Sequence, residues 1–95
     1  MILTYLQEFD FALTEGQLVL THHGRPERAW VVPESDGLYV ISTFTSDFGA
    51  GQCHGAVLSD GRTVVIADDF GLVAAIYPSL AAAHAGDNNQ QLEEA

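Results

Sequence analysis

The stretch VLSDGRTVVIADDFGLVAAIYP (residues 57–78) contains the pattern that decides the fold. Its runs RTVVIA (62–67) and LVAAIYP (72–78) are rich in β-branched residues and bounded by Asp and Gly, so both predict strands. Both are apolar on successive residues, which is typical of central strands that another element covers. The short connection between the two runs leaves no room for a helical crossover and predicts antiparallel pairing.

Four further runs on the N-terminal side of this stretch read as strands because they share its β-branched and aromatic composition. They are QLVLTH (17–22), AWVVP (29–33), LYVISTFT (38–45) and GAVLS (55–59). Asp36-Gly37 and Asp60-Gly61 each carry the dipeptide that best fits a two-residue type I′ hairpin turn. Gly24 and Pro26 mark a third turn, so the strands are predicted to follow one another as an antiparallel meander.

Helices are predicted at one or two places. In PSLAAAHAG (78–86), Pro78 and Ser79 form a start, the alanines propagate the helix and Gly86 ends it. Residues 2–13 have Leu3, Leu6, Phe9 and Leu13 at helical spacing, which favours a short helix, although Thr4, Tyr5 and Phe11 also suit a strand. The predicted fold class is therefore α+β, an antiparallel meander of about five to six strands with one or two short helices packed on it. One domain is expected over residues 1–86, followed by a polar, frayed tail over 87–95.

Charge restricts the function more than any motif does. The 95 residues contain thirteen Asp and Glu against three Arg and no Lys, for a formal net charge of −10. Nucleic-acid binding and adhesion to anionic membranes both depend on Lys and Arg, so this composition argues against direct contact with either. A partner protein with a basic surface is favoured instead, because opposite charge accelerates and orients association.

Three features of the sequence predict the cellular compartment. Cys53 is the single cysteine, so an internal disulfide is impossible and a reducing cytosol suits the chain. The N-terminus lacks the cationic region of a signal peptide, and the longest apolar run is far shorter than the roughly 20 residues of a membrane span. A soluble cytoplasmic protein is expected, with a monomer and a homodimer both left open.

Candidate metal ligands and nucleophiles do not match a known spacing. They are His22, His23, Cys53, His54, Asp68 and Asp69. Neighbouring residues on a strand point to opposite faces, so neither His22 with His23 nor Cys53 with His54 is expected to share one ion. The favoured interpretation is exposed loop histidines, a small buried cysteine and a flexible glycine-rich turn at GAGQCHGA (49–56). A mixed His, Cys53 and Asp site remains the alternative; no metal, cofactor or catalytic residue is predicted.

The run GQLVLTHHGRPERAWVVP (16–33) resembles the β-hairpin of the Phd/YefM antitoxin family, in which a strand enters a His-Gly-Arg-Pro turn and returns through an apolar strand ending in Pro. That family places a longer helical region before the hairpin and a helix with a toxin-binding tail after it. Here only sixteen residues precede Gln17 and more strands follow Pro33. The likeness is interpreted as shared hairpin chemistry, with Gly24 and Pro26 making the turn and the arginines solvated or paired with Glu27 or Glu34.

These observations predict a non-enzymatic, acidic protein-binding module. The favoured class is an inhibitor of a basic nucleic-acid-handling protein machine, of the phage or mobile-element anti-defence type such as an anti-CRISPR; this likeness is one of class and not of motif. The first alternative is an antitoxin or immunity-type protein, and the second is a small thiol- or metal-dependent enzyme using Cys53 and His54. The residues predicted to contact the partner are Glu8, Asp10, Glu15, Asp68, Asp69, Asp87, Glu93 and Glu94.

Overall fold

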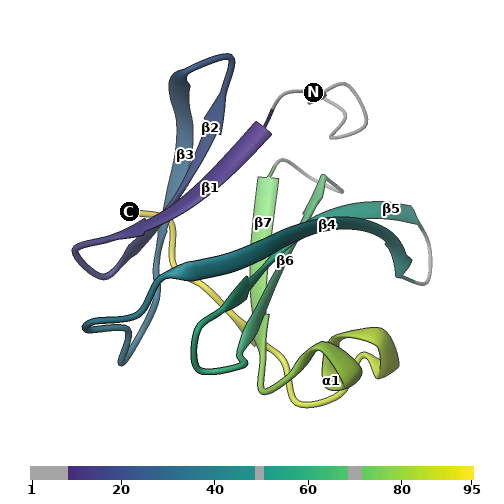
Figure 1. Cartoon of the computed structure of the whole chain (residues 1–95). Helices are drawn as coiled ribbons and strands as arrows, with labels where there is room; N and C mark the ends of the chain where they lie inside the picture. The colour runs from purple at the N-terminus through teal and green to yellow at the C-terminus, as the bar shows by residue number, and fades with distance from the viewer. Residues whose placement is uncertain (1–8, 49–50, 69–71) are drawn as a thin grey trace.

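A computed structural model describes residues 9–48, 51–68 and 72–95, and these form two antiparallel sheets with one short helix (Figure 1). The elements are β1 (Phe9–Thr14), β2 (Gln17–His22), β3 (Arg25–Val31), β4 (Val40–Phe48), β5 (Gly51–Leu58), β6 (Thr63–Asp68), β7 (Leu72–Tyr77), α1 (Leu80–Ala85) and β8 (Gln90–Gln91). The first sheet has the order β1-β2-β3 and the second the order β4-β5-β6-β7-β8. Antiparallel pairing is confirmed, but the prediction of a single meander is wrong, because the chain leaves the first sheet after β3.

Two-residue turns with left-handed backbone close both hairpins of the first sheet. Glu15 and Gly16 have φ values of 53° and 78°, and His23 and Gly24 have values of 52° and 76°. Positive φ at both central residues defines the type I′ turn, whose twist matches that of the flanking strands. The predicted hairpin at HHGRPE is therefore present, and its turn lies at His23-Gly24. The prediction that Pro26 belongs to the turn is wrong, because Pro26 lies in β3 and pairs with Thr21.

The two Asp-Gly dipeptides do not form the type I′ turns that the sequence predicted. In the β5–β6 hairpin only Gly61 of the pair has positive φ, at 95°. The Gly61 N–H donates to the Leu58 carbonyl at 2.9 Å and the Leu58 N–H donates to the Arg62 carbonyl at 2.8 Å, which makes a longer, three-residue connection. Asp36-Gly37 closes no hairpin, because it lies between β3 and β4, which belong to different sheets.

Both faces of the second sheet are covered, which explains the unbroken apolar runs of β6 and β7. Val64 and Ile66 belong to the main core, where they pack with residues of the first sheet such as Leu18 and Trp30. Val65 points the other way and forms a second cluster with Cys53, Ala83 of α1 and the partly buried residues around them. The predicted helix covers one face of this sheet, and the first sheet, which was not predicted as a separate layer, covers the opposite face (Figure 1).

The helix over 78–86 is confirmed with its predicted ends. The Ser79 hydroxyl accepts a hydrogen bond from the Ala82 N–H at 3.1 Å, and Gly86 ends the helix in the left-handed region at φ 72°. The helix favoured over 2–13 is wrong for residues 9–13, which form β1; residues 2–8 lie outside the described part of the chain. Burial alternates along β1, with Phe11 in the core and its neighbours Asp10 and Ala12 exposed, so the period is that of a strand.

The C-terminal segment, expected to be frayed, joins the two sheets instead. Gln90 and Gln91 pair with β7, and the Leu92 N–H donates to the Ala74 carbonyl at 2.9 Å. Beyond Leu92 the chain turns to β3, where the Val31 N–H donates to the Glu93 carbonyl at 2.8 Å. The segment is polar in composition, but its one large apolar residue, Leu92, is only 4% exposed and anchors it in the main core.

Candidate functional site

Two of the three arginines are held by contacts within the chain. Arg28 donates a hydrogen bond from Nη1 to Oε1 of Glu94, and this bond with its opposite charge raises the pKa of Arg28. Arg62 donates from Nε to Oδ2 of Asp60 at 2.6 Å. Burial acts to raise the pKa of the Asp60 carboxyl, but the hydrogen bonds from Arg62 outweigh it and the pKa is lowered. Arg25, beside the β2–β3 turn, makes no ion pair within the described residues.

The acidic residues predicted to contact a partner do not gather in one place. Asp10 lies on β1, Glu15 in the β1–β2 turn and Asp87 beyond α1, and all three are exposed. Glu93 and Glu94 lie in the segment that joins the sheets, and Glu94 is occupied by Arg28. Of the others, Asp68 ends β6, while Glu8 and Asp69 lie outside the described residues.

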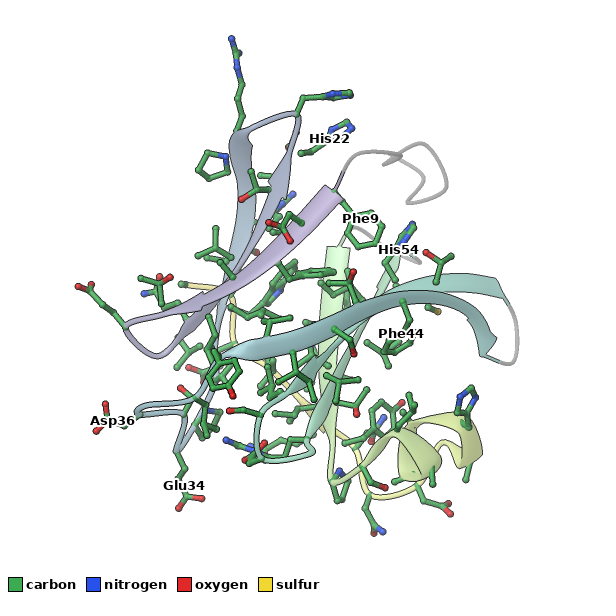
Figure 2. The ribbon with its side chains drawn as sticks, viewed as in Figure 1. Phe9, His22, Glu34, Asp36, Phe44 and His54 are labelled. Carbon is green, nitrogen blue, oxygen red and sulfur yellow. The ribbon has the colours of Figure 1, made fainter. Side chains whose placement is uncertain are left out.

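Three acidic residues from two separate connections line one hollow, a grouping that the sequence did not predict. Glu15 in the β1–β2 turn, with Glu34 and Asp36 in the β3–β4 connection, lines one open hollow. The floor of that hollow includes Leu13, Val32 and Leu38. Figure 2 shows Glu34 and Asp36 projecting outward from the connection. No local motif signals this grouping, which depends on the docking of one connection against the other.

Hydrogen bonds fix the backbone of the residues that line the hollow. The Val32 N–H donates to the Gly16 carbonyl at 2.8 Å, which ties the β1–β2 turn to the end of β3. The buried Ser35 hydroxyl donates to the Val32 carbonyl at 2.8 Å, and the Leu38 N–H donates to the Ser35 carbonyl at 3.0 Å. The sequence left the arginines either solvated or paired with Glu27 or Glu34; in the structure the Glu34 carbonyl, not its carboxylate, accepts a hydrogen bond from Arg62.

Apolar side chains continue the surface along the start of β4. Tyr39 is 62% exposed and Ile41 is 55% exposed. The pairing of β4 with β5 shifts by one residue between Val40 and Ser42, which leaves Ile41 as the extra residue of a bulge. The Tyr39 backbone is fixed by two bonds with Ser59, whose N–H donates to the Tyr39 carbonyl at 2.8 Å. Acidic and apolar groups therefore lie close together along the chain on this part of the surface.

The histidines at the β2–β3 turn are closer together than strand geometry predicted. The ring centroids of His22 and His23 are 4.1 Å apart, because His23 has left-handed backbone and no longer follows strand alternation. Nδ1 of His22 lies 3.7 Å from Oε1 of Glu27. Nε2 of His22 is buried and has no hydrogen-bond partner among the described residues. The expected exposed loop histidine is thus half-buried at position 22.

Cys53 and His54 lie inside β5 and not in a flexible turn, so the glycine-rich interpretation is wrong for residues 51–56. Cys53 packs with Val65 in the cluster below α1. His54 is buried, not exposed as expected; its Nδ1 lies 2.9 Å from the Thr45 hydroxyl and its ring centroid 4.3 Å from that of Phe9 (Figure 2). These surroundings place the thiol and the imidazole on opposite faces of the sheet, as neighbouring strand residues are.

The described residues contain neither a metal-binding group nor a helix able to cross a membrane. No group of three or more His, Cys, Asp or Glu there is arranged to hold a metal ion. No helix in the same residues has the length and apolar character needed to cross a membrane. Comparison with protein-family models, curated proteins and solved structures finds no match to this chain. The function of this chain is therefore inferred from its own residues.

Proposed function

We propose that this protein is a non-enzymatic binding module whose acidic surface engages a basic face of a larger protein. The contact face in this proposal is centred on Glu15, Glu34 and Asp36 around the hollow. The observation that supports this proposal is that two of the three arginines form ion pairs within the chain. Arg28 and Arg62 are paired within the chain, so little positive charge is left to offset the carboxylates of a protein with net charge −10.

The class of partner follows from the charge. Proteins that bind DNA or RNA present basic surfaces, since phosphate neutralisation supplies much of their affinity. An acidic domain that covers such a surface competes with the nucleic acid and inhibits the machine. We therefore propose an inhibitor of a nucleic-acid-handling protein, of the phage or mobile-element anti-defence type that includes anti-CRISPR proteins. Direct binding of nucleic acid by this chain is disfavoured by the same electrostatics.

The antitoxin alternative is weakened, because the elements around its hairpin differ from those of the Phd/YefM family. The hairpin resembling the Phd/YefM family is the second half of a three-stranded sheet whose residues Leu18 and Trp30 are fully buried. Its partners are β1 and the C-terminal segment, and the chain continues into β4 with no intervening helix. An enzyme based on Cys53 and His54 is disfavoured by their placement on opposite faces.

The proposal is tested with two variants of equal net charge. Reversing Glu15, Glu34 and Asp36 to Lys changes the net charge by +6, from −10 to −4. Reversing Asp10, Asp87 and Glu93 to Lys makes the same change from −10 to −4 at exposed positions elsewhere. Immobilised wild-type protein and both variants are used to capture partners from lysate of the organism that carries the gene. The captured partner is then assayed for nucleic-acid binding.

A partner captured by the wild type should be lost with the hollow variant and retained by the control variant. The reverse result would place the contact at Asp10, Asp87 and Glu93, which the sequence predicts, and would overturn the hollow as the contact face. Its association should slow as salt rises, because exposed charges are screened beyond about 8 Å at physiological ionic strength, while dissociation changes less. A reversal at Asp68 and Asp69 forms a third arm, since the sequence also predicts contact there. Capture that is unaffected by salt and by all three charge reversals would mean that the acidic surface only keeps the protein in solution.

A further inference from the structure

We propose that the outer edge of β4 binds an extended, basic segment of the partner as an additional strand. This inference rests on the proposed function, because it names the part of the partner that the acidic module would hold. The edge of β4 begins next to the hollow, since Asp36 of the hollow is followed within a few residues by Tyr39 and Ile41. The addition of a strand to a sheet edge is an established mode of peptide recognition, with affinity supplied by main-chain hydrogen bonds.

The first observation is that, among the residues that the structure describes, β4 has a strand partner on one side only. It is the terminal strand of the second sheet and pairs with β5 from Val40 opposite Leu58 to Phe48 opposite Gly51. Strand β1 lies near β4 but pairs with β2, so within the described residues the outer edge of β4 continues into no other strand. In contrast, the exposed edges of β3 and β7 are both taken by the C-terminal segment.

The second observation is that residues 40–46 of this edge include neither a charged residue nor Pro. Natural edge strands are protected by charged side chains, Pro, bulges or short length. Strand β4 has nine residues, and the run LYVISTFTS (38–46) contains no charged residue and no Pro. Two protective features are present: the bulge at Ile41, which leaves a large apolar side chain exposed, and the charged residue Asp47 near the end of the strand. The uncharged part of the edge before Asp47 is suited to a deliberate strand partner in so acidic a chain.

Charge complementarity selects the occupant. Glu34 and Asp36 precede the strand and are exposed, so a bound segment meets two carboxylates near the Val40 end of β4. A second copy of this chain would bring a further net charge of −10 to the same surface and would be repelled. A segment with Lys or Arg alternating with apolar residues can place its cations near these carboxylates and its apolar side chains against Tyr39 and Ile41.

The test uses the full chain and a synthetic peptide of about ten residues in which Lys and Val alternate, a length matched to β4. Binding is followed by fluorescence anisotropy, and amide hydrogen exchange locates the contact. We expect slower exchange at Ile41 to Thr43 when the peptide is present. Ile41→Lys should weaken binding by about tenfold or more, because it places a cation at the edge. Val31→Lys, a substitution with the same charge change at a 42% exposed residue of β3, should weaken it much less.

A second peptide of the same sequence, N-methylated at alternate residues, keeps the charges and removes main-chain donors. It should bind far more weakly if strand addition is correct. Equal binding of both peptides, or no change in exchange along β4, would overturn the inference. So would a concentration-dependent homodimer that Ile41→Lys dissociates without any peptide. If a partner is captured in a salt-dependent way but β4 is unprotected in that complex, this inference fails while the proposed function stands.

Discussion

The Arg62 guanidinium donates a hydrogen bond from Nη1 to the Pro33 carbonyl at 2.7 Å, across 29 positions of the chain. A second bond runs from Nη2 to the Glu34 carbonyl at 2.8 Å, and Nε contacts the Asp60 carboxylate. Pro33 follows the last strand of the first sheet, whereas Arg62 closes the β5–β6 turn of the second. One side chain therefore holds the connection between the sheets against a hairpin, and it also supports the backbone that carries Glu34.

Replacing Arg62 by Met should lower the free energy of unfolding by about 1–3 kcal/mol, because it removes charge-assisted hydrogen bonds from three acceptors. Arg62→Lys should recover little of this loss, since an ammonium group cannot reproduce the planar fork that reaches two carbonyls at once. Arg25→Met removes the same charge from the exposed first residue of β3 and serves as the control. Chemical denaturation measures all three; equal midpoints for Arg62→Met and Arg25→Met would contradict the role given to Arg62.

The contact between Arg62 and Asp60 should make stability depend on acid pH. The pKa of Asp60 is lowered in the folded protein from its ordinary value of 3.8, so its contribution is complete above that value and is lost as the pH falls through the folded pKa. The difference in melting temperature between wild type and Asp60→Asn should thus shrink between about pH 6 and about pH 2. Asp87→Asn, at an exposed carboxylate without an ion pair in the described residues, should show no such convergence.

Gly55→Ala should be strongly destabilising, although alanine is small. A Cβ atom on Gly55 would overlap the Phe44 ring and would lie 2.7 Å from the Val64 carbonyl oxygen on the neighbouring strand. Overpacking of this kind costs about 1–3 kcal/mol, which thermal denaturation can measure. Adding Phe44→Leu to Gly55→Ala should restore part of the loss by removing the ring, but not the part due to the Val64 backbone. Stability equal to wild type in Gly55→Ala would show that the strands can separate without cost.

Leu92→Ala should destabilise the protein by about 2–5 kcal/mol, as expected for a large-to-small change in a core. Leu92 is 4% exposed and belongs to the main core together with Trp30 and Ala74. Gln91→Ala, at the exposed neighbouring position of β8, is the matched control and should change stability by less than about 0.5 kcal/mol. If both variants melt alike, the C-terminal segment is as loosely held as its composition suggests.

Cys53→Ala should leave partner binding intact. The Cys53 thiol packs with Val65 and Ala83 and faces away from His54, so the substitution removes the thiol and opens only a small space. A modest loss of stability, about 1 kcal/mol, is expected from the cavity. Binding is measured by the capture assay described above, with circular dichroism as the check on folding. Complete loss of activity in a folded Cys53→Ala protein would favour the thiol enzyme instead.

The sequence by itself determined the local elements, because their signals act over a few residues. The helix after Pro78 was predicted with both of its ends, since Ser79 and Gly86 satisfy helix termini wherever a helix lies. Strand β2 was predicted over its full length, and β6 and β7 nearly so. The excess of negative charge was also plain from composition. These features require no knowledge of what packs against them.

Only the tertiary structure decided how the strands are divided and which acidic residues meet. The same Asp-Gly dipeptide helps to close a hairpin at 60–61 and joins two sheets at 36–37, so the turn residues could not distinguish the two outcomes. Glu15 and Glu34 line one hollow because Val32 bonds to Gly16, a contact that composition and periodicity do not encode. Burial of apolar surface between layers selects such arrangements, and it depends on residues far apart in the chain.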